Sequence, residues 1–567
     1  MTTNTPPTHE DLLRRIRELE KEVAHWRNQV SHKQYGLVWM DVPEAFDTES
    51  LHSIPILEEE NHLSFCQDDG KPTHVLIEGD NYHSLTCLNY THRNSIDVIY
   101  IDPPYNTGND GFTYKDSRFI TKQPDGQPLK KNHPLRHSAW LSFMAKRLRL
   151  AKELLKDDGA IFISIDDNEQ ANLKLLCDQV FGANNLLANL IWKSKSGGAS
   201  DSKFMAVDHE YILCYGKHAE KLSQFMDDQA EVTTSYNLSD EKGPYALDRL
   251  DKQNIRYSDS LNYEIKDPEG NSYFPKHKNP EKPNATWRWS KKTVAERYAE
   301  LVFKNGCVYT KNYKKEVNIA RSLLVEERFG RTRSGKTELE SIDKAFNFSA
   351  PKPSKLIYHL LNVFPRQKDE PLTVLDFFAG SGTTMHAVSS LNAKDGGRRQ
   401  CILCQASEAD ICRSVTLERN RRVMQGYTNA KGEEVKGLGG SLKFYRTAFV
   451  GRHMAREASD ADRIDLAARA GCLLALAENT LYETERAERF QFFTDHDGRH
   501  TAIYFNEDYS DFPAFETHLR SLTGSTAIYV FSWGDGTEFA PMFDDLPNVV
   551  VKSIPQPILD IYKSLNT

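Results

Sequence analysis

Three short apolar runs constrain the fold of this chain more than any other feature. They are VLIEGD (75–80), IDVIYID (96–102) and AIFISID (160–166), and each is apolar on both faces rather than alternating with polar residues. Strands of this kind are typical of parallel sheets that helices cover on both sides. The amphipathic run WLSFMAKRLRLAKELL (140–155) supplies such a helix between the second and third strands. We therefore predict an α/β fold with a doubly wound sheet.

A second α/β stretch covers residues 354–425. It contains a helix around KLIYHLLNVF, the strand TVLDFF, a helix after Gly382 and the strand RQCILCQ. The segment between the two stretches, 192–349, is long, polar and rich in turn residues, which predicts an inserted domain. The final 120 residues combine the helix AARAGCLLALAEN with the strands TAIYF and AIYVF, which predicts a small C-terminal α/β domain.

The strand IDVIYID ends on Asp102-Pro103-Pro104-Tyr105. Open α/β sheets bind ligands beyond the carboxyl ends of their strands, so this is a candidate catalytic position. The two prolines keep the backbone extended and leave carbonyl groups without neighbouring N–H groups. Asp102 and the Pro103 carbonyl could accept both hydrogens of an amino group on a base flipped out of a duplex, and Tyr105 could stack on its ring. The alternative is a turn that only ends the strand.

A glycine-rich loop follows the strand that begins at Thr373. It leads into a helix and reads Asp376-Phe377-Phe378-Ala379-Gly380-Ser381-Gly382-Thr383-Thr384. Glycines at this place let the backbone approach a ligand closely and present N–H groups at the start of a helix. Glu408, at the end of the next strand, is placed to bind ribose hydroxyls. This context predicts a nucleoside-binding site.

Together these motifs resemble those of adenine-specific DNA methyltransferases in which the catalytic motif precedes the cofactor motif. They are most similar to the modification (Mod) subunits of type III restriction–modification systems. The resemblance covers almost the whole chain apart from the central insert. It is carried by GDN (79–81), IDVIYIDPPYNTG (96–108), GAIFISIDDNE (159–169), VDHEYILCY (207–215), FSAPKPSKLI (348–357), LDFFAGSGTT (375–384) and IPQPILDIYK (554–563).

The resemblance implies a Rossmann-like S-adenosylmethionine-dependent methyltransferase fold, with a doubly wound mixed sheet. It implies transfer of a methyl group from S-adenosylmethionine to N6 of adenine in DNA, with no metal. Asp102, Pro103, Pro104 and Tyr105 are the expected catalytic residues. The expected cofactor-binding residues, with Glu408 on the ribose, are Asp80, Lys352, Pro353, Asp376, Phe378, Ala379, Gly380, Gly382, Thr383 and Glu408.

The same resemblance divides the chain into five parts. We expect an N-terminal helix and irregular arm over 1–70, and the catalytic half of the methyltransferase core over 71–191. Residues 192–349 are the expected target-recognition domain, 350–446 the cofactor half of the core, and 447–567 an α/β assembly domain.

Two other functions compete with this interpretation. An N4-cytosine methyltransferase would use the same geometry on another amino group, but that class usually begins its catalytic motif with Ser, whereas this chain has Asp102. A non-catalytic DNA-recognition subunit of a restriction complex would not need both motifs intact. The run from Gly330 to Thr337 also fits the phosphate-loop pattern GxxxxGK[ST], but the charged segment before it is not a buried strand, so we interpret the match as coincidence. Its arginines are better candidates for contacts to DNA phosphates.

Charge and aromatic residues point to DNA as a partner. Residues 271–340 carry 16 Lys and Arg against 8 Asp and Glu, and their aromatics include Trp287, Trp289, Tyr309 and Tyr313. Such a basic, ring-bearing surface is one signature of nucleic-acid contact, and a solvated basic face over an aromatic core is the alternative. Phosphate contacts are expected of Lys311, Lys314 and Lys315.

Assembly and location are predicted from the ends of the chain and from its composition. Leu12, Ile16, Leu19, Val23, Trp26 and Val30 form a heptad seam in a helix over 9–30. This seam and the resemblance predict a homodimer that can recruit a restriction subunit with helicase and nuclease activity. Scattered cysteines, with no signal peptide and no membrane span, predict a bacterial cytoplasmic protein that associates with the nucleoid through DNA. Cys401 and Cys404 form a lone CxxC in a buried strand, where a zinc site is not expected.

Overall fold

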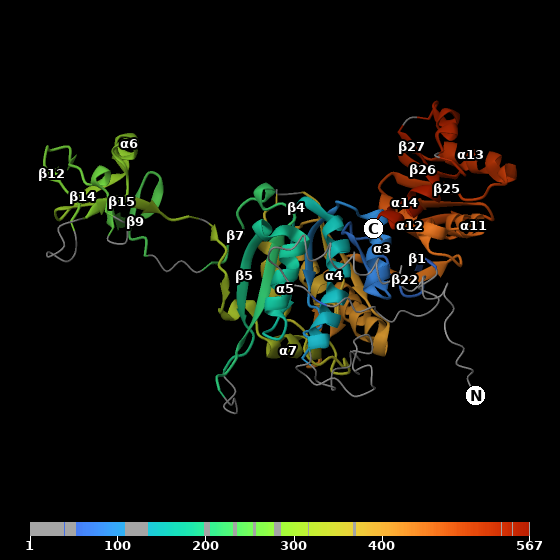
Figure 1. The fold of residues 1–567 in the computed structure, drawn as a ribbon, viewed down its shortest axis with the longest axis horizontal. Coiled ribbons are helices and arrows are strands. Elements are labelled where there is room, and N and C mark those ends of the chain that lie inside the picture. The colour runs from blue at the N-terminus through green and yellow to red at the C-terminus, as the bar shows by residue number, and fades with distance from the viewer. Residues whose placement is uncertain are drawn as a thin grey trace, which may run out of the picture. The chain divides into compact units, whose positions relative to one another are not determined.

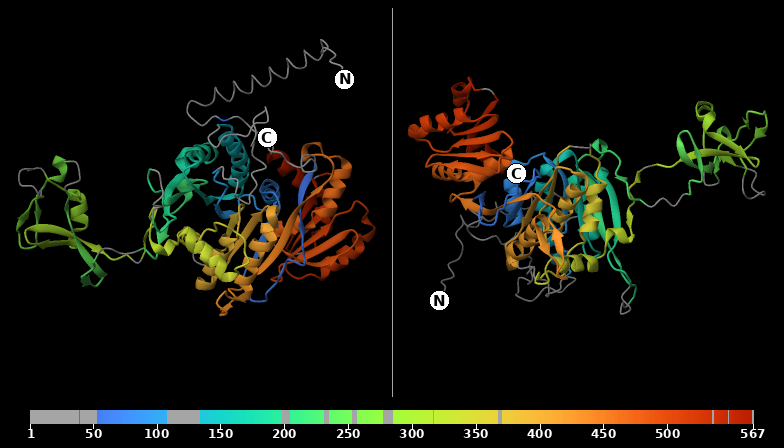
Figure 2. Two further views of the ribbon diagram at one scale, coloured as in Figure 1. Left: turned by 90° about the horizontal axis from the view of Figure 1, so that it is seen from below. Right: turned by 180° about the vertical axis from the view of Figure 1, so that it is seen from behind.

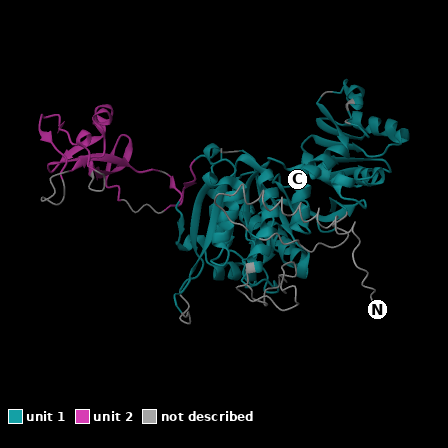
Figure 3. Cartoon of the chain, viewed as in Figure 1, with its two compact units in different colours: residues 1–223, 321–567 teal, residues 224–320 magenta. Residues whose placement is uncertain are grey.

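The computed structural model describes residues 39, 53–107, 134–197, 204–230, 235–252, 257–276, 285–315, 317–366, 370–534, 536–546 and 548–565. The chain divides into two compact units, Met1–Ser223 with Arg321–Thr567, and Gln224–Ala320 (Figure 3). The helix predicted over 9–30 lies outside the described residues. Among the helices that are described, none is long and apolar enough to cross a membrane.

A ten-stranded mixed sheet forms the centre of the first unit (Figure 1). Its strands, in spatial order, are β1 (Ile54–Glu59), β22 (Ser441–Val450), β2 (Thr73–Glu78), β19 (Arg399–Gln405), β18 (Leu372–Asp376), β3 (Ile96–Ile101), β4 (Leu155–Ile165), β6 (His209–Gly216), β5 (Leu186–Lys193) and β17 (Leu323–Leu324). Neighbouring strands from β22 to β4 are parallel, whereas β1 and β6 run antiparallel to their neighbours. The predicted α/β fold class is confirmed.

The order of the strands brings the two α/β stretches of the sequence together. β19 and β18 come late in the chain, yet they lie between the early strands β2 and β3. β18 pairs in parallel with β3, with Val374 opposite Val98. The loops that follow these two strands therefore leave the same edge of the sheet next to each other. This is the position at which doubly wound sheets bind ligands.

Helices cover both faces of this sheet. One group consists of α3 (Asn81–Thr91), α4 (Pro134–Leu154) and α5 (Gln170–Cys177), which pack on one another. A second group consists of α7 (Thr332–Ile342), α8 (Ser354–Asn362), α9 (Thr383–Asp395) and α10 (Glu418–Gln425). The crossovers through α3 and α9 step across the sheet in opposite directions, so right-handed connections place these helices on opposite faces (Figure 2).

The C-terminal segment packs on the ten-stranded sheet and shares its core. Its five-stranded sheet has the order β23 (Tyr482–Arg486), β24 (Phe490–Thr494), β25 (Arg499–Tyr504), β26 (Ser525–Phe531) and β27 (Val549–Ile554). Its helices are α11 (Asp460–Arg469), α12 (Gly471–Glu478), α13 (Phe512–Ser521) and α14 (Gln556–Leu565). Leu473 and Ile558 belong to the same buried cluster as Leu85 of α3, and the Tyr562 hydroxyl donates to the Pro55 carbonyl at 3.1 Å. A hairpin of β20 (Gly426–Thr428) and β21 (Glu434–Lys436) follows α10.

The second unit has a sheet and a core of its own. Its main strands are β14 (Leu301–Lys304), β15 (Cys307–Tyr313), β9 (Gly243–Arg249) and β8 (Leu238–Asp240), with the short helix α6 (Lys291–Glu296). Three two-stranded pairs complete it, namely β10 (Asp251–Lys252) with β13 (Thr286–Trp287), β11 (Ile265–Lys266) with β12 (Ser272–Tyr273), and β7 (Met226–Asp227) with β16 (Asn318–Ile319). This unit is shorter than the segment 192–349, because β6, β17 and α7, which lie within that segment, belong to the first unit.

The aromatic residues of the second unit serve different purposes. Trp287 is buried in the cluster with Leu250, Tyr263 and Val308, and its indole N–H donates to the Tyr263 carbonyl at 2.7 Å. It is therefore a core residue, as the alternative of an aromatic core under a basic face predicts. Tyr313, at the end of β15, donates its hydroxyl to Asp240 at 2.8 Å.

Candidate functional site

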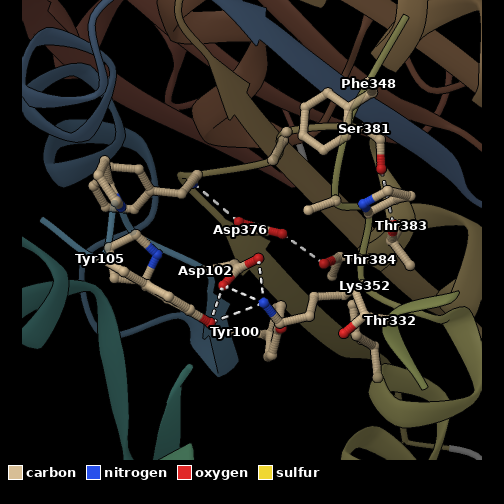
Figure 4. Close-up of a pocket in the computed structure, with 18 of the residues that line it drawn as sticks. Tyr100, Asp102, Tyr105, Thr332, Phe348, Lys352, Asp376, Ser381, Thr383 and Thr384 are labelled. Carbon is tan, nitrogen blue, oxygen red and sulfur yellow. Dashed lines mark hydrogen bonds and ion pairs between the residues drawn. The ribbon is translucent and has the colours of Figure 1, made fainter. Parts of the chain in front are cut away.

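One pocket of about 280 Å³ lies at the sheet edge where β3 and β18 end (Figure 4). Its walls come from the two loops predicted to carry the chemistry and from the segment before α8. The residues that line it are Tyr100, Asp102, Pro103, Pro104, Tyr105, Asn106, Thr107, Glu210, Thr332, Phe348, Ala350, Pro351, Lys352, Ile357, Asp376, Phe378, Ala379, Gly380, Ser381, Thr383 and Thr384. The pocket thus joins the predicted catalytic motif to most of the predicted nucleoside-binding loop.

Asp102 lies directly after β3 and is held by two neighbours. The Lys352 ammonium donates to both of its carboxylate oxygens at 2.9 Å, and the Tyr105 hydroxyl donates to Oδ1 at 2.8 Å (Figure 4). Lys352 also donates to the Tyr105 oxygen at 2.8 Å. Asp102 is therefore fixed in place at the end of the strand, where it lines the pocket.

The two proline carbonyls of the motif have different surroundings. The indole N–H of Trp140, a fully buried residue of α4, donates to the Pro104 carbonyl at 2.6 Å. Pro104 is thereby anchored to the helix, while Pro103 lines the pocket beside Asp102. Because proline lacks an N–H group, neither residue offers a backbone donor to a ligand. The motif therefore presents acceptors to whatever enters the pocket.

Lys352 is buried but stays charged. Burial works against the ammonium, yet Asp102 and Glu210 outweigh it and raise the pKa of Lys352. The Glu210 carboxylate, on β6, lies 3.3 Å from the Lys352 ammonium. Burial and the charges of Asp102 and Glu210 also raise the pKa of Tyr105, so the phenol keeps its proton.

Asp376 ends β18 and organises the glycine-rich loop. It accepts the Phe378 N–H at 3.0 Å and the Thr384 hydroxyl at 2.5 Å, which ties the strand to the start of α9. Burial, together with the charge of Asp102, raises the pKa of Asp376 to about 7. Near neutral pH this carboxyl is therefore balanced between its charged and neutral forms, and a cation in the pocket would favour the charged one.

The glycines of the loop adopt conformations that other residues avoid. Gly380 has φ +52° and Gly382 has φ +75°, both in the left-handed region. A Cβ atom on Gly382 would come within 2.2 Å of the Asn420 amide nitrogen, so this glycine permits close packing against α10. Gly380 instead faces Phe348 and lines the pocket. The second glycine serves packing, and the first serves the pocket.

Four predicted cofactor residues lie outside the lining of the pocket. Asp80 caps α3 by accepting the Tyr82 N–H at 2.7 Å and lies 3.3 Å from the Arg147 guanidinium. Gly382 packs below the loop, and Pro353 follows the pocket residue Lys352. Glu408 begins a short 3-10 helix, Glu408–Asp410, after β19. Direct ligand contacts for these four stay predictions.

Several pocket residues were not predicted from the sequence. Glu210, Thr332 and Phe348 come from segments distant from both motifs, and Tyr100 lies within the strand itself. Glu210 belongs to VDHEYILCY, a run that carried the family resemblance without an assigned role. A charged residue at the start of an otherwise apolar strand was the signal that could have singled it out.

The phosphate-loop match at 330–337 has a structural explanation. A 3-10 helix, Glu327–Phe329, comes directly before it in place of a buried strand, and α7 already begins at Thr332, so Gly335 lies inside a helix. A Cβ atom there would come within 2.3 Å of the Pro351 carbonyl, which means that the glycine lets α7 pack against the segment that carries Lys352. Arg331 donates to the carbonyls of Val325, Glu326 and Gly330 rather than pointing freely to solvent. Contact of the arginines of this run with DNA phosphates stays a prediction.

A family model and curated relatives both relate this chain to DNA methyltransferases. Residues 96–423 match the family model described as DNA methylase. The chain is 33% identical to the type III restriction-modification enzyme EcoPI Mod subunit of Escherichia phage P1, over 70% of this chain and 66% of that protein. It is 31% identical to the EcoP15I Mod subunit of Escherichia coli, over 74% and 69%. The matched parts span 54–69% of the EcoPI, StyLTI and EcoP15I Mod subunits.

Among solved structures, the PvuII DNA methyltransferase (cytosine-N4-specific) aligns with a TM-score of 0.32 at 11% identity, over 61% of this chain and 87% of that one. The family model covers more than half of the chain, including both motifs of the pocket. The predicted relationship to DNA methyltransferases and type III modification subunits is confirmed. The chain belongs to the DNA methylase family.

Proposed function

We propose that this protein is a site-specific DNA methyltransferase that transfers a methyl group from S-adenosylmethionine to N6 of adenine. In this proposal it acts as the modification subunit of a restriction–modification system. One observation carries the proposal: in a DNA methylase family member, the Asp102 motif and the glycine-rich loop line one pocket at the ends of the paired strands β3 and β18.

The pocket suits S-adenosylmethionine in size and chemistry. Phe348, Ile357 and Phe378 provide apolar walls for an adenosine ring, and the start of α9 provides N–H groups for polar atoms. Carboxyl groups of Asp102, Glu210 and Asp376 face a pocket that would receive a cation. When bound, S-adenosylmethionine supplies a methyl group activated by its positively charged sulfur.

The roles of the protein groups follow from their contacts. The amino nitrogen of adenine is a weak nucleophile because its lone pair is delocalised into the ring. Asp102 and the Pro103 carbonyl accept its two hydrogens, which shifts electron density back to the nitrogen. Tyr105 provides an aromatic face for a base that has left the duplex stack. Positioning and electrostatics supply the catalysis. A bound S-adenosylmethionine would supply the methyl group and keep the electron pair of the broken S–C bond on its sulfur, and the proton lost by the amino nitrogen would pass to solvent.

Methylation of unmethylated DNA tests the proposal. Purified protein is incubated with DNA and S-adenosylmethionine labelled in its methyl group, and the modified nucleoside is identified by mass spectrometry. N6-methyladenine at one recurrent sequence supports the proposal. N4-methylcytosine as the product would favour the cytosine alternative. Absence of methyl transfer despite cofactor binding would favour a non-catalytic recognition subunit.

In this proposal the segment 192–349 recognises the target sequence in DNA, and the compact unit Gln224–Ala320 forms its central part. Lys314 and Lys315 follow β15 and are exposed, whereas Lys311 is paired with Asp240 at 2.6 Å. We therefore assign phosphate contacts to Lys314 and Lys315 and an internal ion pair to Lys311.

Changing these lysines to alanine should separate the two roles. Lys314→Ala and Lys315→Ala are each expected to lower the slope of log affinity against log salt by about 0.9, the value for one lost phosphate contact. Lys311→Ala is the matched control on the same strand and should leave the slope nearly unchanged. Fluorescence anisotropy with labelled duplex across a salt series measures all three. Equal slopes for all variants and the unaltered protein would contradict the assignment.

We also propose a homodimer that associates with a separate restriction subunit, based on the heptad seam over 12–30 and on the Mod relatives. Light scattering at micromolar concentration should give about twice the chain mass of 64.8 kDa. Removal of residues 1–35 is the informative truncation, because removal of 447–567 would cut β22 and expose the shared core. A monomer with full methylation activity would contradict the dimer.

A further inference from the structure

Glu210 is a buried carboxylate of the pocket for which the proposed mechanism has no use. Its side chain is 17% exposed, and it lies at the start of β6, which pairs with β4 and β5. It is within 3.3 Å of the Lys352 ammonium and 3.2 Å of the Tyr105 hydroxyl. A carboxylate in such a place costs desolvation energy, so its retention calls for a reason in the chemistry of the pocket.

The charges of the pocket explain what Glu210 can do. Among the described residues that line it are the carboxyl groups of Asp102, Glu210 and Asp376 and one ammonium, that of Lys352, which pairs with Asp102 and Glu210. With Asp102 alone as its partner, Lys352 would neutralise the carboxylate that the amino group of the base must reach. Glu210 supplies a second carboxylate. The Lys352 ammonium donates to both oxygens of Asp102 and to Tyr105, and it forms an ion pair with Glu210 at 3.3 Å.

The Lys352 side chain is held in the pocket by the residues around it. Its ammonium lies 4.9 Å from the centre of the Tyr105 ring and 5.9 Å from that of Trp192, and its side chain is only 9% exposed. Gly335 of α7 packs against the backbone that precedes it. The cation is therefore a fixed part of the site, and its charge must be balanced by fixed carboxylates.

We propose that Glu210 is a positioning residue for methyl transfer: it neutralises Lys352, so that the charge of Asp102 stays available to the amino group and to the cationic methyl donor. This inference rests on the proposed function, because it concerns which ligand charge the same pocket prefers. The pocket favours a cofactor with a positively charged sulfur over one with a neutral sulfur, and Glu210 is a source of that preference.

The test compares two cofactors that differ in this charge. Calorimetry gives the dissociation constants of S-adenosylmethionine and of the neutral thioether S-adenosylhomocysteine, for the unaltered protein and for Glu210→Gln. Loss of one charge near the pocket is expected to weaken binding of S-adenosylmethionine about tenfold and binding of the thioether less than about twofold. The rate of methyl transfer at saturating cofactor should fall as well, and Glu210→Asp, which keeps the charge, should restore much of the preference.

Glu78→Gln is the matched control. Glu78 is also a buried carboxylate paired with a cation, Arg413 at 2.6 Å, but it does not line the pocket. This variant should reveal the effect of removing a buried charge on folding, with an unchanged ratio of the two dissociation constants. Thermal unfolding of both variants reports their stability.

The outcomes distinguish this inference from the proposed function. A Glu210→Gln protein with an unchanged ratio of the two constants and an unchanged rate would overturn the role of Glu210 while leaving the methyltransferase proposal intact. A proportional loss of affinity for both cofactors would also overturn it, because a structural role has that result. An unaltered protein that binds neither cofactor would instead overturn the proposed function.

Discussion

Replacement of Asp102 by alanine is expected to reduce the rate of methyl transfer about a thousandfold, in line with the loss of one preorganised polar group from an active site. Asp102 lies at the end of β3, held by Lys352 and Tyr105, with its carboxylate in the pocket. Alanine removes the acceptor that polarises the amino group, so the nitrogen keeps its lone pair in the ring. Lys352 retains Glu210 as a partner at 3.3 Å, so the pocket should keep its structure.

The measurement is single-turnover transfer of a labelled methyl group, with cofactor affinity determined in parallel by calorimetry. Asp97→Asn is the matched control, because Asp97 lies on the same strand but accepts from Lys156 and from the Thr373 N–H, outside the pocket. This control should retain most of the methyl transfer. A near-normal rate for Asp102→Ala would exclude the catalytic assignment, whatever the affinity for the cofactor.

The sequence allowed the sheet and its two functional loops to be predicted because both depend on local patterns. Strands that are apolar on both faces indicate a covered parallel sheet, and such strands end where ligands bind. The neighbourhood of Asp102 and Asp376 was expected only through the family resemblance. The pairing of β3 with β18 that creates it is a long-range choice of strand order, which no local pattern encodes.

The residues that were missed depend on contacts between distant segments. Glu210, on β6, contacts Lys352, which comes before α8, and neither segment contains a pattern that indicates the other. The phosphate-loop match shows the converse problem, because a local pattern is present there without the site that it usually indicates. Its glycine at 335 is explained by the close approach of Pro351, which only the folded chain reveals.

The inserted segment shows how composition misleads about single residues. The basic and aromatic composition of this segment indicated a DNA-contacting surface. Trp287 nevertheless lies in the core of its unit, and Lys311 is paired with Asp240. A small unit needs its large aromatic residues for its own core, since it has few other side chains to bury. Lys314 and Lys315, which follow β15 and are exposed, keep the predicted role as a proposal.

Gly380→Val is expected to weaken binding of S-adenosylmethionine at least about tenfold, since valine is strained in the left-handed region and intrudes on the ligand. Gly380 has φ +52°, and a Cβ atom there would lie 3.1 Å from the Phe348 ring, inside the lining of the pocket. The two methyl groups of valine extend further from that Cβ. The backbone of the loop would have to shift, and with it the Gly380 N–H that donates to Gln405 at 2.7 Å.

Backbone strain alone could weaken binding by destabilising the protein, and Gly396→Val controls for it. Gly396 ends α9 with φ +71°, but its Cβ position has no neighbouring atom within 4 Å. Both variants should therefore unfold at a lower temperature, whereas only Gly380→Val should lose affinity in calorimetry. Unchanged affinity in Gly380→Val would remove this loop from the cofactor site. The same loss in both variants would show that strain in the fold, rather than intrusion on the pocket, causes it.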